Sequence, residues 1–140
     1  MSFCAASAQA PTSSPTHPCP LLRNSAPALQ YIHCGSGIEH AEGLGTPAGE
    51  AQEGFQIWVN TPSAQKMDAP RYGTHGASEL PVVPLPGGAT ATLLAGALGG
   101  AAGPLVTRGA DVFMADLALP AGGAVEHAVP PEHNTVLVYV

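Results

Sequence analysis

The sequence predicts an all-β fold, a barrel of the jelly-roll type, and three observations lead to this class. The chain of 140 residues holds 17 glycines and 15 prolines, which favour turns over long regular elements. Charged residues make up only 10% and aromatic residues 5%, a mixture that favours short strands over helices. Runs of β-forming residues recur between the Gly and Pro turns, as in small barrels. The length is enough for one domain with a core.

The first 29 residues are rich in Ala, Ser and Pro and contain no Asp, Glu or Lys. Five prolines in this stretch would interrupt any helix or strand ladder, so we expect residues 1–29 to be largely disordered. Two other interpretations stay open. Ser-rich, acid-poor composition is typical of a transit peptide, although Arg23 is the only Lys or Arg here. Alternatively, the segment does not belong to the fold, through alternative splicing or a faulty gene model.

Two strands are predicted between residues 30 and 62. Residues 31–34 contain β-formers and stop at a turn at 35–37. Residues 55–60 alternate in the manner of a strand, which ends at Pro62 because Pro cannot continue a ladder. We expect Trp58, the only tryptophan, to anchor packing. Cys34 is expected to be a small buried residue and His33 an ordinary strand residue.

The second half continues the pattern of short strands. Residues 63–72 form a polar connector, and 97–103 form a loop of small residues. Turns are expected at 86–88 and 120–123, and three histidines, His75, His127 and His133, fall at turns or loops. Strands are predicted at residues 79–85, 90–94, 111–119, 125–129 and 135–140.

Charge and cysteine content exclude some function classes. The net charge is −6 with only four Lys and Arg residues, which argues against direct binding to nucleic acid. No window has enough consecutive apolar residues to cross a bilayer, so no membrane association is expected. The three cysteines (Cys4, Cys19 and Cys34) are an odd number without zinc-type spacing, which favours a reduced, intracellular chain, cytoplasmic or nuclear.

One short motif carries possible metal chemistry, the His40-Ala41-Glu42 sequence. In an extended strand alternate side chains share a face, so His40 and Glu42 would point to the same side and Glu39 to the opposite, solvated side. An imidazole and a carboxylate placed together can act as two ligands of a divalent transition metal. Surface strands also carry such pairs, so the motif needs support from its context.

Two longer stretches supply that context. Residues 30–42 resemble the segment of the pirin family that leads into its last two metal ligands, a His and a Glu two residues apart. Residues 54–62, followed by Lys66-Met67 and Pro70-Arg71-Tyr72, are similar to the most recognisable signature of that family. Two motifs in the right order make residues 30–140 similar to pirins, whereas residues 1–29 show no resemblance.

The resemblance implies a fold and a domain plan. Pirins are bicupins, with two small β-barrels in tandem and one metal, usually iron, in the first. By this resemblance His40 and Glu42 are metal ligands, and the histidines of the second half are solvated because the second cupin of the family has lost its metal. The chain would be truncated at both ends and divided as follows: 1–29, a leader; 30–62, the C-terminal remnant of the first cupin; 63–78, an interdomain connector; 79–140, the first half of the second cupin.

The other two family ligands, a His-x-His pair on an earlier strand, have no clear counterpart. Only His17-Pro18-Cys19 is faintly similar, and too little chain separates His17 from His40 to hold the intervening strands. Half of the ligand set is therefore missing, and two protein ligands rarely hold iron well. We expect iron to be bound weakly or not at all.

Three functions follow from the resemblance. Several pirins open the flavonol quercetin with dioxygen at the metal, so the first is a pirin-like remnant related to quercetin 2,3-dioxygenases, with a flavonol substrate and with impaired or no metal-dependent activity. Pirins also act as nuclear co-regulators, so the alternative is a non-enzymatic protein-binding module that contacts a transcription factor. The last possibility is an inactive truncated isoform.

Overall fold

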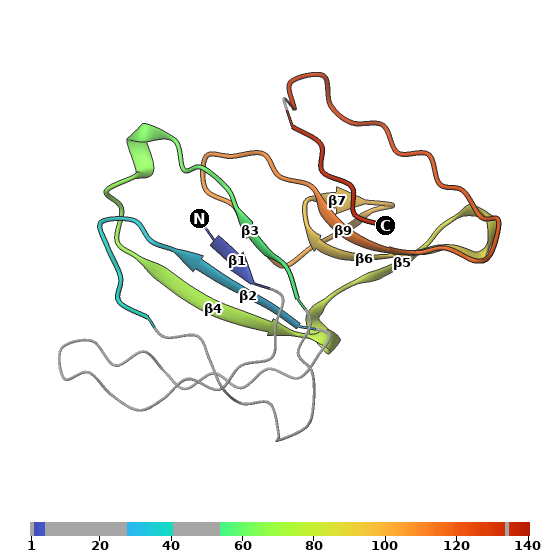
Figure 1. Ribbon diagram of the computed structural model, residues 1–140, viewed down its shortest axis with the longest axis horizontal. Helices are drawn as coiled ribbons and strands as arrows, with labels where there is room; N and C mark the ends of the chain where they lie inside the picture. The colour runs from blue at the N-terminus through green and yellow to red at the C-terminus, as the bar shows by residue number, and fades with distance from the viewer. Residues whose placement is uncertain (1, 5–27, 41–53, 134) are drawn as a thin grey trace.

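The chain folds into antiparallel β-sheets, which confirms the all-β class (Figure 1). The computed structural model describes residues 2–4, 28–40, 54–133 and 135–140. This part of the chain contains no α-helix, and no helix in it has the length and apolarity that crossing a membrane requires. Its helical turns are short and of the 3-10 type: η1 (Ser63–Gln65), η2 (Ala77–Glu79) and η3 (Pro86–Gly88).

The first sheet has four strands in the order β3-β1-β2-β4, and all neighbours are antiparallel. Its strands are β1 (Ser2–Cys4), β2 (Ala28–His33), β3 (Gln56–Trp58) and β4 (Arg71–Gly76). The predicted strands near residues 31 and 56 are confirmed as β2 and β3. The strand β1 had no signal in the sequence, and residues 5–27 of the predicted leader lie outside the described residues.

Strand β4 occupies residues that were expected to form part of a connector. It pairs with β2 over six residues, with His33 opposite Arg71 and Leu29 opposite His75. No strand was predicted at these residues, and the interpretation of 63–78 as an interdomain connector stays a prediction. The two glycines and few apolar residues of β4 gave a weak strand pattern, and hydrogen bonding to a long neighbouring strand overrides such local preference.

The second sheet has the order β5-β6-β9, and a small hairpin lies beside it. Its strands are β5 (Val82–Pro84), β6 (Thr90–Ala95) and β9 (Met114–Ala118), and the hairpin consists of β7 (Ala97–Leu98) and β8 (Ala101–Ala102). The strands predicted at 79–85, 90–94 and 111–119 are confirmed in these positions. The loop predicted at 97–103 is instead a hairpin, because Gly99 and Gly100 adopt positive φ angles that permit a tight turn.

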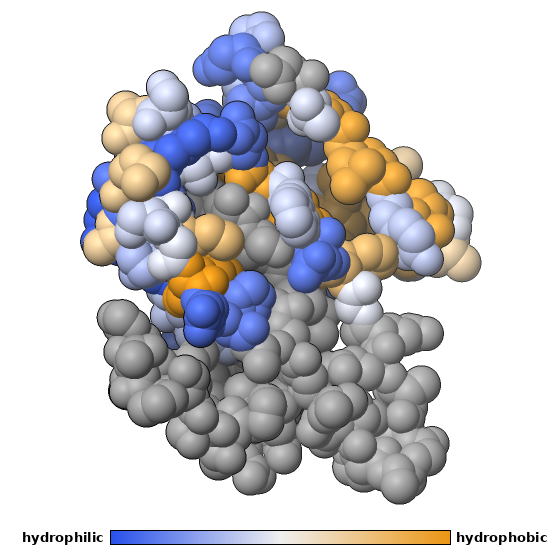
Figure 2. Space-filling view, turned by 60° about the vertical axis from the view of Figure 1, so that its left-hand side comes forward, coloured by the Kyte–Doolittle hydropathy of each residue, from blue (hydrophilic) through white to orange (hydrophobic). Residues whose placement is uncertain are grey.

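Two predicted strands do not form. Residues 125–129 and 135–140 have no strand assignment, although both runs contain β-formers. Strand propensity is expressed only when a neighbour supplies hydrogen bonds, and neither run pairs with a strand in the described part of the chain. Apolar side chains consequently reach the surface: Val136, Leu137, Val138, Tyr139 and Val140 are all more than half exposed. Figure 2 shows apolar side chains at the surface on one face of the molecule.

The core consists of two apolar clusters. The first joins the two main sheets, because Leu29 of β2 and Ala95 of β6 belong to it together with Leu80 and Leu105. The second contains Val83, Ala91 and Leu93 and lies within the second sheet. The register of β6 against β9 shifts between Leu93 and Ala95, where β6 passes from the second cluster to the first. One strand thus contributes side chains to both clusters.

Candidate functional site

The turn that leads to the predicted metal ligands is held by two backbone hydrogen bonds. The amide of Gly37 donates to the carbonyl of Cys34, and the amide of Ser36 donates to the carbonyl of Asp68, both at 2.8 Å. Gly35 has a φ of 48°, and a Cβ atom there would overlap the Asp68 carbonyl oxygen. The predicted turn at 35–37 is confirmed, and glycine is required at 35 both for its backbone angle and for the close approach of Asp68.

His40 lies a few residues beyond this turn and is exposed, as is Glu39. Residues 37–40 are not part of a hydrogen-bonded strand. Glu42 lies outside the described residues. The joint placement of the two side chains therefore stays a prediction.

The described residues do not fit an iron site by themselves. Among them, no group of three or more His, Cys, Asp or Glu side chains is placed to hold a metal ion. Iron in proteins is held by several nitrogen and oxygen ligands, as in the site of two His and one carboxylate. The donor set of these residues is therefore smaller than an iron site requires.

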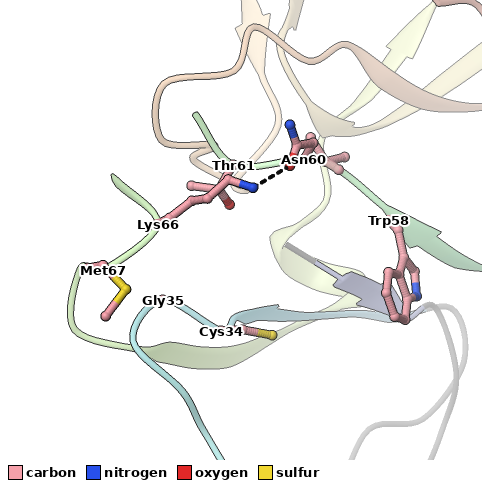
Figure 3. Close-up of a pocket in the computed structure, with 8 residues that line it drawn as sticks. Cys34, Gly35, Trp58, Asn60, Thr61, Lys66 and Met67 are labelled. Carbon is pink, nitrogen blue, oxygen red and sulfur yellow. Dashed lines mark hydrogen bonds between the residues drawn. The ribbon is translucent and has the colours of Figure 1, made fainter. Parts of the chain in front are cut away.

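A cavity of about 540 Å³ adjoins the same turn (Figure 3). Cys34, Trp58, Met67, Asn60 and Lys66 are among the residues that line it. The Lys66 Nζ donates to Asn60 Oδ1 at 3.1 Å. This hydrogen bond links the residue that follows η1 to the segment that follows β3. His40 is not among the described residues that line this cavity.

The structure corrects the expected burial of two of these residues. Trp58 is 80% exposed, and its Nε1 donates to Gln56 Oε1 at 3.1 Å on the same face of β3. Strand β3 is a short edge strand, and the partly buried Ile57 packs against the first core cluster, so Trp58 points the other way. Cys34 is exposed because it follows the last residue of β2 and lies at the turn.

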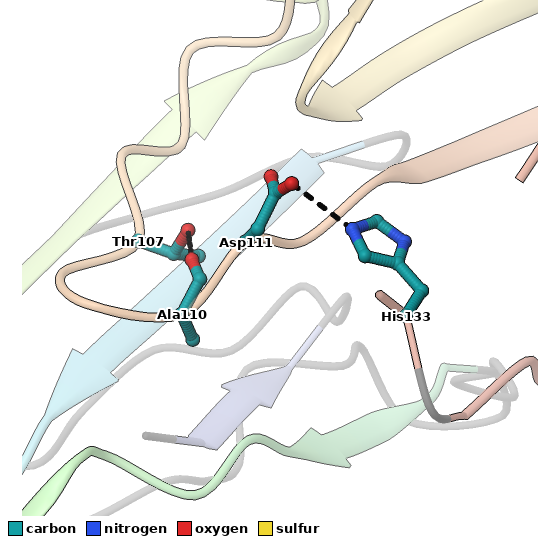
Figure 4. A network of polar contacts seen from close by, with 4 residues as sticks. All are labelled: Thr107, Ala110, Asp111 and His133. Atoms are coloured by element: carbon teal, nitrogen blue, oxygen red, sulfur yellow. Dashed lines mark hydrogen bonds and ion pairs between the residues drawn. The ribbon is translucent and has the colours of Figure 1, made fainter. Parts of the chain in front are cut away.

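Two of the three histidines of the second half also differ from expectation. His75 lies in β4 and its ring stacks on Tyr31 with a centroid distance of 5.9 Å. The side chain of His133 is only 14% exposed, and its Nε2 donates to Asp111 Oδ2 at 3.0 Å, as Figure 4 shows. His127 is exposed, although its ring stacks on Phe113. The expected turn or loop position is thus wrong for His75, which lies in a strand. His133 lies in a loop as expected, but its side chain is mostly buried, and His127 agrees with the expectation.

The sequence analysis did not identify one group of side chains that the fold brings together around a second cavity. Tyr31, His33, Arg71 and His75 line a second cavity together with residues of the segment after β8. These residues are far apart in the sequence and meet only because β4 pairs with β2. A histidine at the end of a strand of mostly apolar residues, His33, was the one local signal that could have pointed to it.

Short antiparallel strands in several sheets define the protein as all-β and cupin-like. Comparison with known proteins then gives the family. The chain is 37% identical over 110 residues to a pirin-like protein of Caulobacter vibrioides, which covers 78% of this chain and 40% of that protein. It is 31% identical over 112 residues to Pirin-1 of Arabidopsis thaliana, which covers 80% of this chain and 37% of that protein.

A third relative carries an activity in its name. The chain is 33% identical over 116 residues to a Pseudomonas aeruginosa protein named as a candidate quercetin 2,3-dioxygenase, which covers 80% of this chain and 40% of that protein. Over about 80% of its length the chain therefore belongs to the pirin family. It spans 37% to 40% of the length of these three relatives. No family model matches the chain, and no solved structure matches it.

Proposed function

We propose that this chain is a pirin-type cupin protein whose own residues supply only part of an iron site. The quercetin 2,3-dioxygenase type of activity, with a flavonol substrate and iron as its metal, would then be weak or absent in the chain by itself. The proposal is supported by the pirin relatives and by the relative named for that dioxygenase. The same resemblance assigns only His40 and Glu42 as ligands within this sequence.

The observation that carries the proposal is the donor set. The sequence has a clear counterpart for only two of the ligands that the resemblance implies, His40 and Glu42, and the residues that the structure describes contain no cluster of three metal-binding side chains. Two protein ligands leave most coordination positions to water, so iron would exchange readily with the solvent. We infer that a bound iron, where present, is held loosely at His40 and Glu42.

Iron content tests this proposal. The full chain is expressed in iron-supplemented medium, purified, dialysed and assayed for iron by atomic emission. The expected result is well below one iron per chain, and His40→Ala should lower whatever iron remains after dialysis. Near one iron per chain, lowered by His40→Ala, would contradict the proposal and identify a complete site. Quercetin consumption and oxygen uptake with added Fe²⁺ should not exceed those of His40→Ala.

A protein-binding function is the second candidate, and one observation favours it. The apolar side chains of residues 136–140 are exposed, and such surface commonly marks a contact with another protein. Relatives in mouse and Arabidopsis carry the name pirin, and by resemblance the partner would be a transcription factor. Titration of metal-free chain with such a factor is expected to show binding that is lost in the Leu137→Ser, Val138→Ser double variant. Binding that is equal in both forms would contradict this role for the exposed residues.

A further inference from the structure

The second cavity, of about 350 Å³, is built on one face of the first sheet. Tyr31 and His33 of β2 and Arg71 and His75 of β4 line it from this side. The register explains why they meet, since His33 lies opposite Arg71 and alternate residues of a strand share a face. Pro104, Val106 and Arg108 line it from the segment after β8. We call this the cationic cavity.

His33 is the unusual member of the cationic cavity. Its exposed fraction is 1%, and neither ring nitrogen has a hydrogen-bond partner in the described part of the chain. Burial of an unpaired polar group is costly, so most such groups in proteins have a partner in the protein or an ordered water. A ligand that accepts a hydrogen bond from this imidazole would remove that cost.

The charge around His33 indicates the sign of such a ligand. The chain has a net charge of −6 and only four Lys and Arg residues, yet two of them, Arg71 and Arg108, line this one cavity. No Asp or Glu is among the described residues that line it. A local concentration of cations in an acidic protein favours an anionic ligand.

Two of the side chains that line the cavity lie close to acidic residues that do not line it. Arg108 lies 3.8 Å from a carboxylate oxygen of Asp68, and His75 Nδ1 lies 3.6 Å from Glu79 Oε2. The guanidinium of Arg71 has no such ion pair within the described residues. Arg71, directly opposite His33 in the sheet, is therefore the cation that remains available to a ligand.

The rest of the cavity is apolar and aromatic. The Tyr31 ring stacks on His75 at an interplanar angle of 18° and lies over Gly73, where a Cβ atom would come within 2.8 Å of ring carbon atoms. Glycine at 73 thus makes room for the ring. Pro104 and Val106 add apolar surface from the other side. The cavity combines a cationic end with walls suited to a hydrocarbon or aromatic group.

We propose that the cationic cavity binds a small organic carboxylate with an apolar or aromatic body. The guanidinium of Arg71 binds the carboxylate through its paired N–H groups. The ring nitrogens of His33 are buried, so the ring rotates toward the cavity for one N–H to donate to the same group. The body of the ligand contacts Tyr31, Pro104 and Val106. The volume lies within the range of roughly 300–1,000 Å³ usual for small-molecule sites. His40, the predicted iron ligand that the structure describes, does not line this cavity.

Benzoate is a suitable probe because it unites both features, whereas benzyl alcohol lacks the charge and inorganic phosphate lacks the apolar body. Titration of the full chain by calorimetry, with binding mapped by NMR, is expected to give a Kd on the order of 1 mM for benzoate, which is reasonable for a ligand of this size. Shifts should fall on the ring signals of His33 and Tyr31. Benzyl alcohol and phosphate should each bind at least about tenfold more weakly, because each lacks one set of contacts.

Arg71→Met tests the site, and Lys66→Met is the matched control because it removes the same charge outside the cationic cavity. Arg71→Met should weaken benzoate binding by about tenfold or more and Lys66→Met by less than about twofold, since charge-assisted bonds depend on contact. Arg108→Met provides a second variant should Arg71→Met fail to fold, with a smaller loss expected because Arg108 is already paired. Absence of saturable benzoate binding, equal losses in Arg71→Met and Lys66→Met, or tighter binding of phosphate would overturn the proposal.

Discussion

Strands β2 and β6 are both six residues long, yet they bury their side chains differently. In β6 the buried residues alternate, with Ala91, Leu93 and Ala95 fully buried and their neighbours half-buried. In β2, Leu29, Gln30, Ile32 and His33 are all buried, so both faces of the strand are covered. The comparison teaches that strict alternation marks a strand with one packed face, whereas a doubly covered strand can hide polar residues as well as apolar ones.

The two buried polar residues of β2 differ in turn from each other. Gln30 Nε2 donates to Tyr72 Oη at 2.8 Å across the β2–β4 pair, whereas both ring nitrogens of His33 lack a partner among the residues described. Gln30 therefore stabilises the sheet, whereas the unpaired ring nitrogens of His33 lower the stability of the folded protein. A residue that lowers stability while lining a cavity is a reasonable candidate for binding.

The largest effect is expected when the core shared by the two sheets is weakened. Leu29→Ala removes a fully buried side chain from the cluster that joins β2 to β6, and should lower the free energy of unfolding by about 2–5 kcal/mol. Urea denaturation followed by circular dichroism measures this. Leu117→Ala, at a position 46% exposed on β9, is the control and should cost less than about 1 kcal/mol. Separate transitions for the two sheets would contradict a shared core.

A smaller loss is expected at the glycine that accommodates Tyr31. Gly73→Ala places a methyl group against the Tyr31 ring and should destabilise the protein by about 1–3 kcal/mol, as overpacking does. Gly76→Ala in the same strand is the matched control, because a Cβ atom there meets no atom within 4 Å. Thermal denaturation of both variants tests the difference. Equal melting temperatures would show that the Tyr31 ring moves aside freely.

Apolar substitutions of the two buried polar residues of β2 should change the free energy of unfolding in opposite directions. Gln30→Leu removes the donor to Tyr72 and should lower the free energy of unfolding by about 1 kcal/mol. His33→Phe removes two unpaired nitrogen atoms and, in buffer without carboxylates, should raise it by a similar amount, about 1 kcal/mol. Denaturant titration resolves both values. A loss of stability in His33→Phe would indicate that the imidazole has a partner in the unliganded protein.

The smallest effect is expected at the only tryptophan. Because Trp58 is 80% exposed on the outer face of an edge strand, Trp58→Ala should change the free energy of unfolding by less than about 0.5 kcal/mol. Chemical denaturation followed by circular dichroism suits this variant, which has lost its tryptophan fluorescence. A decrease of several kcal/mol in the free energy of unfolding would show that Trp58 has the packing role predicted from the sequence.

Local sequence patterns predicted the elements whose side chains alternate. Residues 90–94 have the alternation of β6, and the turn at 35–37 has the glycine that its positive φ requires. Strand β4 was missed because Gly73 and Gly76 weaken its local preference, and its partner β2 lies some 40 residues away. The exposed position of Trp58 likewise depends on the order of strands in the sheet, which local patterns do not contain.

Of the two candidate sites, one was proposed from a local motif, and the other is formed only by the arrangement of the strands. His40 and Glu42 were proposed from a short motif, and only His40 lies in the described part of the chain, exposed and outside any strand. The cationic cavity could not be predicted, because β2, β4 and the segment after β8 each contribute only part of it. Residue type indicated neither the burial of His33 nor its position opposite Arg71; both follow from the register of the sheet.

Asp68 contacts both candidate regions of the molecule. Its backbone carbonyl accepts the hydrogen bond of Ser36 in the turn that leads to His40, and its carboxylate faces Arg108 at the rim of the cationic cavity. The turn ahead of His40 and one arginine of the cationic cavity therefore contact the same aspartate, one through its backbone and the other through its side chain.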